Sequence, residues 1–402
     1  MPSLPQELIH TIISEIDGIS SLKACALAST MFRDACQRIL LHSLTLSADT
    51  NLPTAALGFL QKSPHIAAYI TRLELKLDLF ADATETTSLY DILDRLENVR
   101  HCTVSGNSSR GWNHPDPTTP LFDFLGRQPL RRLKLCAFGA IPLTILSRFL
   151  ALAPVILLSG VSTDLDVSNA SSWDVEEQTA SNVEELFLHL VGADILELFA
   201  HTIRTTTLRR MSVFLGYGRS KDIISANAET LEHLRIELAD SLSLTTTITP
   251  PLPALRSIEF EVLASDDCIM AQSGLDLVQS FISSSPQLTR ITFVLCCATS
   301  IELTMDLDDL LPLPALDAIF SARPAVHCCW RLDFYVYAFG SIHRVDDIDS
   351  NAGGKLFEGL AMSVRDGMGR TDAEGRLAIE WFNVDKYRER NSDGFWSWHQ
   401  CQ

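Results

Sequence analysis

Residues 231–236, LEHLRI, place apolar side chains at the first, fourth and sixth positions. Residues 255–260, LRSIEF, and 288–293, LTRITF, repeat this pattern further along the chain. A short strand entered from a turn has this pattern, because alternate residues of a strand face the same side. The hexads therefore predict short strands that recur with similar neighbours.

Nine such hexads occur between residues 70 and 334. Their apolar positions are Ile70/Leu73/Leu75, Val99/Cys102/Val104, Leu130/Leu133/Leu135, Val183/Leu186/Leu188, Leu208/Met211/Val213, Leu231/Leu234/Ile236, Leu255/Ile258/Phe260, Leu288/Ile291/Phe293 and Cys329/Leu332/Phe334. The long gap between residues 130 and 183 leaves room for one more strand, at 155–158. Helical patterns lie between the strands, over 86–96, 142–152, 192–203 and 274–282.

Alternating strands and helices at periods of 20–29 residues are typical of leucine-rich repeats. We therefore expect residues 44–402 to form a leucine-rich-repeat-like α/β solenoid with a curved parallel sheet. A doubly wound parallel sheet also alternates strand and helix, but its usual Gly-rich phosphate turns are missing here. The aromatic residues Trp381, Phe382, Phe395, Trp396 and Trp398 are expected to cap the open end of the array, or else to anchor a substrate.

Residues 1–43 follow a helical pattern instead. Leu4, Leu8, Ile12 and Ile16 recur every four residues, which predicts an amphipathic helix with a broad apolar face. Asp17-Gly18 ends this helix, and two further short helices follow before residue 43. Three short helices in 40 residues can barely bury a core of their own. Such a unit needs a partner.

The order of residues in this segment resembles the F-box. The residues that carry the resemblance are Leu4-Pro5-x-Glu7-Leu8-Ile9, Ile12-Ile13-x-x-Ile16, Ser21-Leu22-Lys23-Ala24-Cys25-Ala26-Leu27-Ala28 and Phe32. Together with the hexads, they make the chain similar to the F-box proteins of mushroom-type fungi, in which degenerate leucine-rich repeats follow the F-box. The expected organisation is thus a three-helix F-box-like domain over 1–43 and the solenoid over 44–402.

The resemblance implies a substrate-recognition adaptor of a Skp–cullin–F-box ubiquitin ligase, and no enzyme activity of its own. The F-box would dock on a Skp-type adaptor, and through it on a cullin, while the repeats hold a protein substrate. The expected adaptor-binding residues are Leu4, Pro5, Leu8, Ile12, Ile13, Leu22, Leu27 and Phe32. The alternative is a leucine-rich-repeat scaffold or inhibitor with no ligase attached, in which the N-terminal helices only cap the first repeat. Exposure of Leu4, Leu8 and Ile12 would favour the adaptor.

Composition excludes several other functions. The chain has 402 residues and a formal net charge of -18, which opposes binding to nucleic acid or to an anionic membrane surface. No signal-peptide pattern opens the sequence, so we expect a cytoplasmic or nuclear protein with reduced, buried cysteines. The sequence lacks motifs for a catalytic centre or a cofactor. The acidic spacing of Asp347, Asp349 and Glu358 fits a calcium loop, but Ala352 replaces the required Gly, so no metal is expected.

The strand residues between the apolar positions should form the substrate-binding face. The expected contacts are Arg235, Glu237, Glu259, Glu261, Asp333 and Tyr335. The acidic members would suit a basic substrate segment. This hypothesis predicts that charge reversal at Glu259 and Glu261 weakens substrate capture without unfolding the protein, and burial of these side chains would contradict it.

Overall fold

The computed structural model contains two compact units, residues 1–207 and 208–402. It describes residues 5–16, 18–47, 52–77, 83–106, 118–163, 178–179, 182–201, 203–204, 207–214, 220–238, 250–264, 272–298, 312–338, 341–344 and 350–381. Both units combine helices with a parallel sheet, so the expected α/β class is confirmed. No helix in these ranges has the length and the apolar character needed to cross a membrane.

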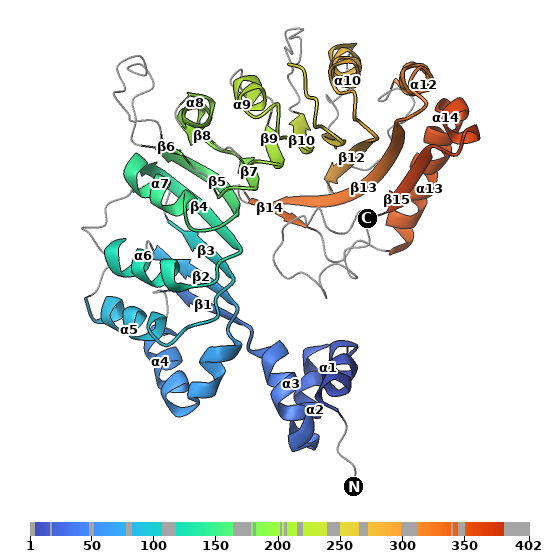
Figure 1. Cartoon of the computed structure of the whole chain (residues 1–402). Coiled ribbons are helices and arrows are strands. Elements are labelled where there is room, and N and C mark those ends of the chain that lie inside the picture. Colours follow the sequence, from blue (N-terminus) through green and yellow to red (C-terminus); the bar gives the residue numbers. More distant parts are fainter. Residues whose placement is uncertain are drawn as a thin grey trace. The chain divides into compact units, whose positions relative to one another are not determined.

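The first unit begins with three helices and continues with strands that alternate with helices (Figure 1). The N-terminal helices are α1 (Gln6–Ser14), α2 (Ile19–Ala28) and α3 (Thr30–Leu40). Gly18 separates α1 from α2 and has a φ of 92°, a conformation that favours glycine. The Ser29 hydroxyl caps α3 by accepting a hydrogen bond from the Met31 N–H at 3.2 Å. The sequence-based prediction of three short helices is therefore confirmed.

Six strands form the sheet of the first unit, in the order β1-β2-β3-β4-β5-β7. Their bounds are β1 Ser43–Ser47, β2 Arg72–Lys76, β3 His101–Ser105, β4 Arg132–Ile141, β5 Val155–Thr163 and β7 Glu185–His189. The connecting helices are α4 Leu52–Lys62, the 3-10 helix η1 Pro64–Tyr69, α5 Ala83–Leu93, α6 Thr118–Arg127 and α7 Leu143–Leu150. Helix α8 (Ala193–His201) and the short pair β6 (Gln178–Thr179) and β8 (Ile203–Arg204) complete the unit.

The second unit repeats this organisation with the parallel strand order β9-β10-β11-β12-β13. The bounds are β9 Arg210–Phe214, α9 Ser220–Ala226, β10 His233–Leu238, β11 Ser257–Ala264, α10 Gln272–Ser284, β12 Arg290–Ala298, α12 Leu313–Ser321 and β13 His327–Ala338. The unit ends with β14 Ser341–Arg344, α13 Ser350–Gly367, α14 Gly369–Ala373 and β15 Leu377–Trp381. Strand β14 pairs antiparallel with β13, and β15 pairs parallel with it.

The hexads align across neighbouring strands, as a solenoid requires. In the first unit Leu73 lies opposite Cys102, and Cys102 opposite Leu133. The added strand between residues 130 and 183 is confirmed as β5, where Ile156 lies opposite Leu133. The aligned residues are buried, and α4 to α8 lie along one face of this sheet (Figure 1). The helices therefore cover the face on which the hexads place their apolar side chains.

One predicted hexad has the wrong register. Cys328 and Trp330, rather than the expected Leu332 and Phe334, lie opposite Ile291 and Phe293 of β12. Apolar residues alternate through Cys328, Trp330, Leu332 and Phe334, so the sequence fits both alignments. The large side chain of Trp330 occupies the core position, where it is fully buried and stacks on Phe293. The sequence analysis also missed strands β1 and β15. The predicted aromatic cap lies outside the described residues, apart from the backbone of Trp381.

The segment whose acidic spacing fits a calcium loop is helical in its second half. Residues 350–358 belong to α13. Residues 345–349 lie outside the described part. Within that part, no group of three or more His, Cys, Asp or Glu side chains could hold a metal ion.

The aromatic stack of the second unit gives a direct test of this core. Phe293 stacks on Trp330 at 4.7 Å and on Phe260 at 5.6 Å between ring centroids. Phe293→Ala should lower the free energy of unfolding by about 3–5 kcal/mol, measured by urea denaturation. Met362→Ala on α13, an exposed site, should change it by less than about 0.5 kcal/mol. A similarly small effect of Phe293→Ala would contradict the described packing.

Candidate functional site

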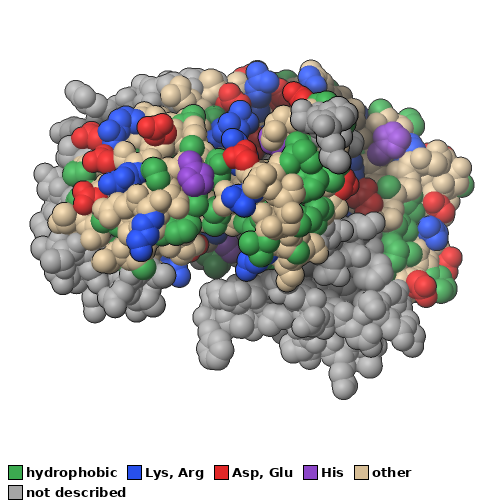
Figure 2. Space-filling model, turned by 90° about the horizontal axis from the view of Figure 1, so that it is seen from below, with side chains coloured by type: hydrophobic (Ala, Val, Ile, Leu, Met, Phe, Trp, Pro, Cys, Tyr) green, Lys and Arg blue, Asp and Glu red, His purple; other side chains and the backbone are tan. Residues whose placement is uncertain are grey.

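The surface of α1–α3 carries most of the exposed large apolar side chains in the described part of the chain. There, six of nine such residues lie between residues 8 and 39. They are Leu8, Ile12, Ile19, Leu27, Met31 and Ile39, here called the apolar surface. Figure 2 shows one face of the molecule, on which hydrophobic side chains gather in patches between charged ones. Contiguous apolar patches on a protein usually mark an interface.

Helix α1 explains how a small unit both folds and keeps an apolar surface. Ile9 and Ile13 lie one turn apart and are 2 % and 1 % exposed, in the core that α1–α3 share. Leu8 and Ile12 also lie one turn apart, on the adjacent side of the helix, and are 50 % and 47 % exposed. Residues four apart share a helix face, so α1 has one buried apolar face and one exposed apolar face.

The predicted adaptor-binding residues divide accordingly. Pro5, Leu8, Ile12 and Leu27 are exposed, Leu27 at 85 %, and Phe32 is partly buried. The prediction is wrong for Ile13 and Leu22. These side chains are 1 % and 5 % exposed and belong to the core that α1–α3 share. Leu4 lies outside the described residues. The sequence analysis missed Ile19, Met31 and Ile39, although each is an apolar residue on a predicted helix.

A polar joint links α3 to the first repeat. The Tyr69 hydroxyl of η1 donates a hydrogen bond to Asp34 of α3. Arg38, one turn further along α3, pairs with Asp34 at 2.8 Å and lies over the Tyr69 ring, 4.8 Å from its centroid. The Tyr69 hydrogen bond, followed by that from Arg38, lowers the pKa of Asp34 below its ordinary value of 3.8. The joint is polar, and it leaves Leu8, Ile12 and Leu27 exposed.

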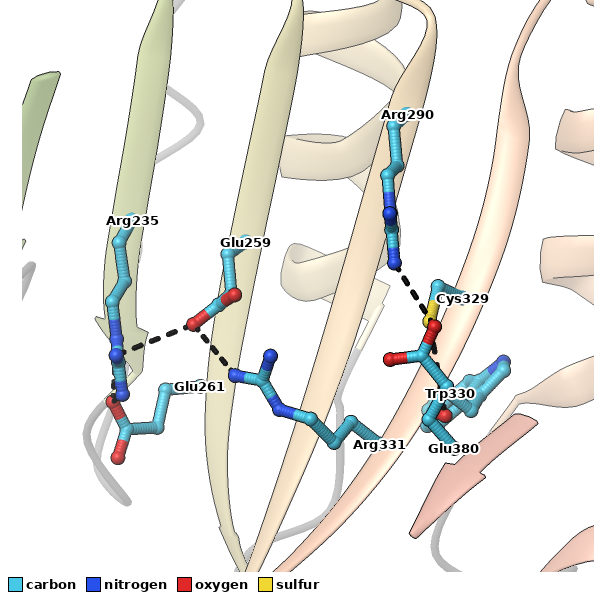
Figure 3. Close-up of polar contacts among 8 residues, drawn as sticks. All are labelled: Arg235, Glu259, Glu261, Arg290, Cys329, Trp330, Arg331 and Glu380. Carbon is cyan, nitrogen blue, oxygen red and sulfur yellow. Dashed lines mark hydrogen bonds and ion pairs between the residues drawn. The ribbon is translucent and has the colours of Figure 1, made fainter. Parts of the chain in front are cut away.

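In the second unit, the three substrate-binding candidates whose side chains are described form part of an ion-pair network. Arg235 of β10 lies opposite Glu259 of β11, and their side chains pair at 3.3 Å. Arg235 also pairs with Glu261, and Arg331 of β13 pairs with Glu259 at 3.1 Å. Figure 3 shows the four side chains reaching toward one another from neighbouring strands. Their two positive and two negative charges balance.

This network contradicts the predicted role of Arg235, Glu259 and Glu261 in binding a basic substrate segment. Arg235 and Glu259 are 6 % and 8 % exposed, and the carboxylates that were expected to attract a basic segment already pair with arginines. The sequence analysis missed Arg331, because it did not consider ion pairs between the charged residues on this face of the sheet. The side chains of Glu237, Asp333 and Tyr335 lie outside the described part. In a nearly buried position each of these charges needs its partner, because breaking a buried pair leaves an uncompensated charge.

The cysteines next to the network are unreactive. Burial, together with the charge of the nearby Glu380, raises the pKa of Cys329 to about 11. Burial also raises the pKa of Cys328 well above its usual value. A thiol is a nucleophile or metal ligand only as the thiolate, so neither cysteine supplies chemistry at neutral pH. Among the described residues, the free thiols are Cys25, Cys36, Cys102, Cys136, Cys328 and Cys329.

Comparisons with known proteins give no family for this chain: no protein-family model matches it, and no curated protein is detectably similar in sequence.

The joint between α3 and η1 predicts a specific titration. Removing the Tyr69 hydroxyl by Tyr69→Phe should move the pKa of Asp34 upward, toward 3.8, because the largest cause of the shift is lost. A lowered pKa in the folded state stabilises it above pH 3.8, and this contribution disappears as the pH falls through the folded value. NMR titration of the Asp34 carboxyl carbon measures the shift, and an unchanged pKa in Tyr69→Phe would contradict the joint.

The network predicts a stability effect where the sequence analysis predicted a binding effect. Glu259→Lys places a third positive charge beside Arg235 and Arg331 in a nearly buried site. It should lower the free energy of unfolding by about 3–5 kcal/mol, as is typical when a buried pair is broken. Glu358→Lys on α13, where the side chain is exposed, makes the same charge change and should cost less than about 0.5 kcal/mol. Equal stability of the two variants in urea denaturation would rule out a structural network.

Proposed function

We propose that this protein is a substrate-recognition adaptor of a Skp–cullin–F-box ubiquitin ligase. In this proposal α1–α3 act as an F-box that docks on a Skp-type adaptor, and the strands and helices that follow hold a protein substrate. The protein has no catalytic step of its own, since ubiquitin transfer belongs to other subunits of such a ligase. The observation that carries the proposal is the apolar surface of α1–α3.

The exposure of Leu8, Ile12 and Leu27 favours this function over a scaffold whose N-terminal helices only cap the first repeat. A cap would bury these side chains against β1, η1 or β2. The contact between α3 and η1 is instead made by Asp34, Arg38 and Tyr69. An amphipathic helix with an exposed apolar face fits a hydrophobic groove on a partner protein. The order of residues in 4–32 also resembles the F-box. This resemblance points to a Skp-type adaptor as the partner.

The solenoid-like parallel sheets support the second half of the proposal. Stacked repeats present extended faces for binding other proteins. In the sheet of the first unit, the residues between the hexad positions of β2 and β3 are partly exposed, in strict alternation with buried ones. This face is available for a partner, whereas the ion-pair network already occupies much of the corresponding face of the second unit.

A single substitution in the apolar surface tests the docking function. Burial of a Leu side chain contributes about 1.5–3 kcal/mol, and Leu8→Asp would also carry an unpaired charge into an apolar groove. Affinity for a purified Skp-type adaptor should therefore fall at least about a hundredfold, since about 1.4 kcal/mol is a factor of ten. Surface plasmon resonance measures this affinity. The melting temperature of the repeats should not change.

Met362→Asp provides the matched control, because Met362 is 63 % exposed on α13, far along the sequence from the proposed F-box. This variant should bind the adaptor as the wild type does. Undiminished adaptor binding by Leu8→Asp, or equal loss in both variants, would contradict the F-box assignment.

A further inference from the structure

The N-terminal ends of β2, β3 and β4 bring together four arginines and a histidine. The parallel register places Arg72, His101 and Arg132 opposite one another at the first position of each strand. Arg100 and Arg131 directly precede β3 and β4, where the Arg131 N–H donates to the Arg100 carbonyl at 2.7 Å. Neighbouring strands lie about 4.8 Å apart, so the three strand positions form a row about 10 Å long. These five residues are here called the arginine edge.

The arginine edge is accessible. Arg100 and Arg131 are exposed, and Arg72, His101 and Arg132 are partly exposed. No acidic side chain of the described residues forms an ion pair with Arg100 or Arg131, whereas nearby Arg127 pairs with Asp94 at 2.9 Å. A cluster of four arginines is unusual on a chain with a net charge of -18. The hexad pattern does not require it, because the hexads fix only the apolar positions.

We propose that the arginine edge binds a short acidic segment of another protein, in extended form. Arginine presents a planar set of donors that matches a carboxylate with two parallel hydrogen bonds. Two acidic residues separated by one residue in an extended peptide lie about 6.6 Å apart, which fits within the row. The match between the positive edge and a negative peptide selects the partner and its register.

The charge of the whole chain favours a short peptide over nucleic acid. A polyanion extends far beyond the edge and meets the field of the surplus acidic residues, whereas a segment with two or three carboxylates interacts with the edge alone. The identification of this segment as part of the ligase substrate rests on the proposed function. Binding of an acidic peptide to the isolated chain is independent of that function. The proposed substrate segment is therefore acidic, whereas the segment predicted from Glu259 and Glu261 was basic.

Fluorescence anisotropy with the full chain tests this inference. The probe is a labelled peptide in which Glu and Ser alternate, and the reference probes are the same peptide with Lys in place of Glu and a single-stranded oligonucleotide of similar length. The Glu peptide should bind, more weakly as salt rises, and the two reference probes should not. Equal or tighter binding of the oligonucleotide would overturn the proposal in favour of a phosphate-backbone site.

Charge reversal locates the binding. The double variant Arg100→Glu, Arg131→Glu should weaken binding of the Glu peptide at least about tenfold, because two exposed donors become repulsive. The control Arg323→Glu, Arg365→Glu makes the same charge change at two exposed sites of the second unit and should stay within about twofold. Equal weakening in both variants, or no binding by the wild type, would overturn the proposal.

The two proposals fail separately in these experiments. Leu8→Asp should keep its affinity for the Glu peptide, and the double arginine variant should keep its affinity for the Skp-type adaptor. Loss of adaptor binding in the arginine variant would show that the edge belongs to the docking surface instead, and would overturn the assignment to a separate acidic segment.

Discussion

The parallel register between neighbouring strands is the constraint on which the rest of the structure depends. Each hexad contributes apolar side chains at alternate strand positions, and the register aligns them with those of the next strand, as in the row from Leu73 through Cys102 to Leu133. These rows form the face that the helices cover. The same register aligns the residues in between, so it also places Arg235 beside Glu259 and Arg132 beside His101. Core, ion-pair network and arginine edge therefore follow from one geometric rule.

The N-terminal helices follow a different rule. Their core consists of only a few side chains, among them Ile9, Ile13 and Cys36, and a unit of about 40 residues cannot bury all of its apolar surface. Leu8 and Ile12 remain exposed on the same helix that supplies this core. The polar joint with Tyr69 attaches α3 to the first repeat without covering them. A docking function for α1–α3 accounts for this division, whereas a capping function leaves it unexplained.

Much of the fold could be predicted from periodicity, because alternation fixes which apolar side chains of a strand face the core. Strand β5 was predicted from the double spacing between hexads and the apolar run at 155–158. The prediction failed at β13, where apolar residues alternate from Cys328 to Phe334 and leave the register open, and the stacking of Trp330 on Phe293 of β12 decides it. The substrate-binding candidates failed for a related reason: alternation placed Glu259 on the correct face, but its burial depends on Arg235 and Arg331, which come from other strands. Which side of α1 is buried likewise depends on α2 and α3, so Ile13 and Leu22 could not be separated from Leu8 and Ile12 in advance.

The central claim is that the apolar surface of α1–α3 is buried by another protein. Isothermal titration calorimetry of the full chain with a purified Skp-type adaptor, repeated at several temperatures, tests this claim most directly. Burial of apolar surface gives a negative change in heat capacity on binding. The account predicts one-to-one binding with a clearly negative heat-capacity change. Absence of binding, or binding whose enthalpy does not vary with temperature, would contradict it.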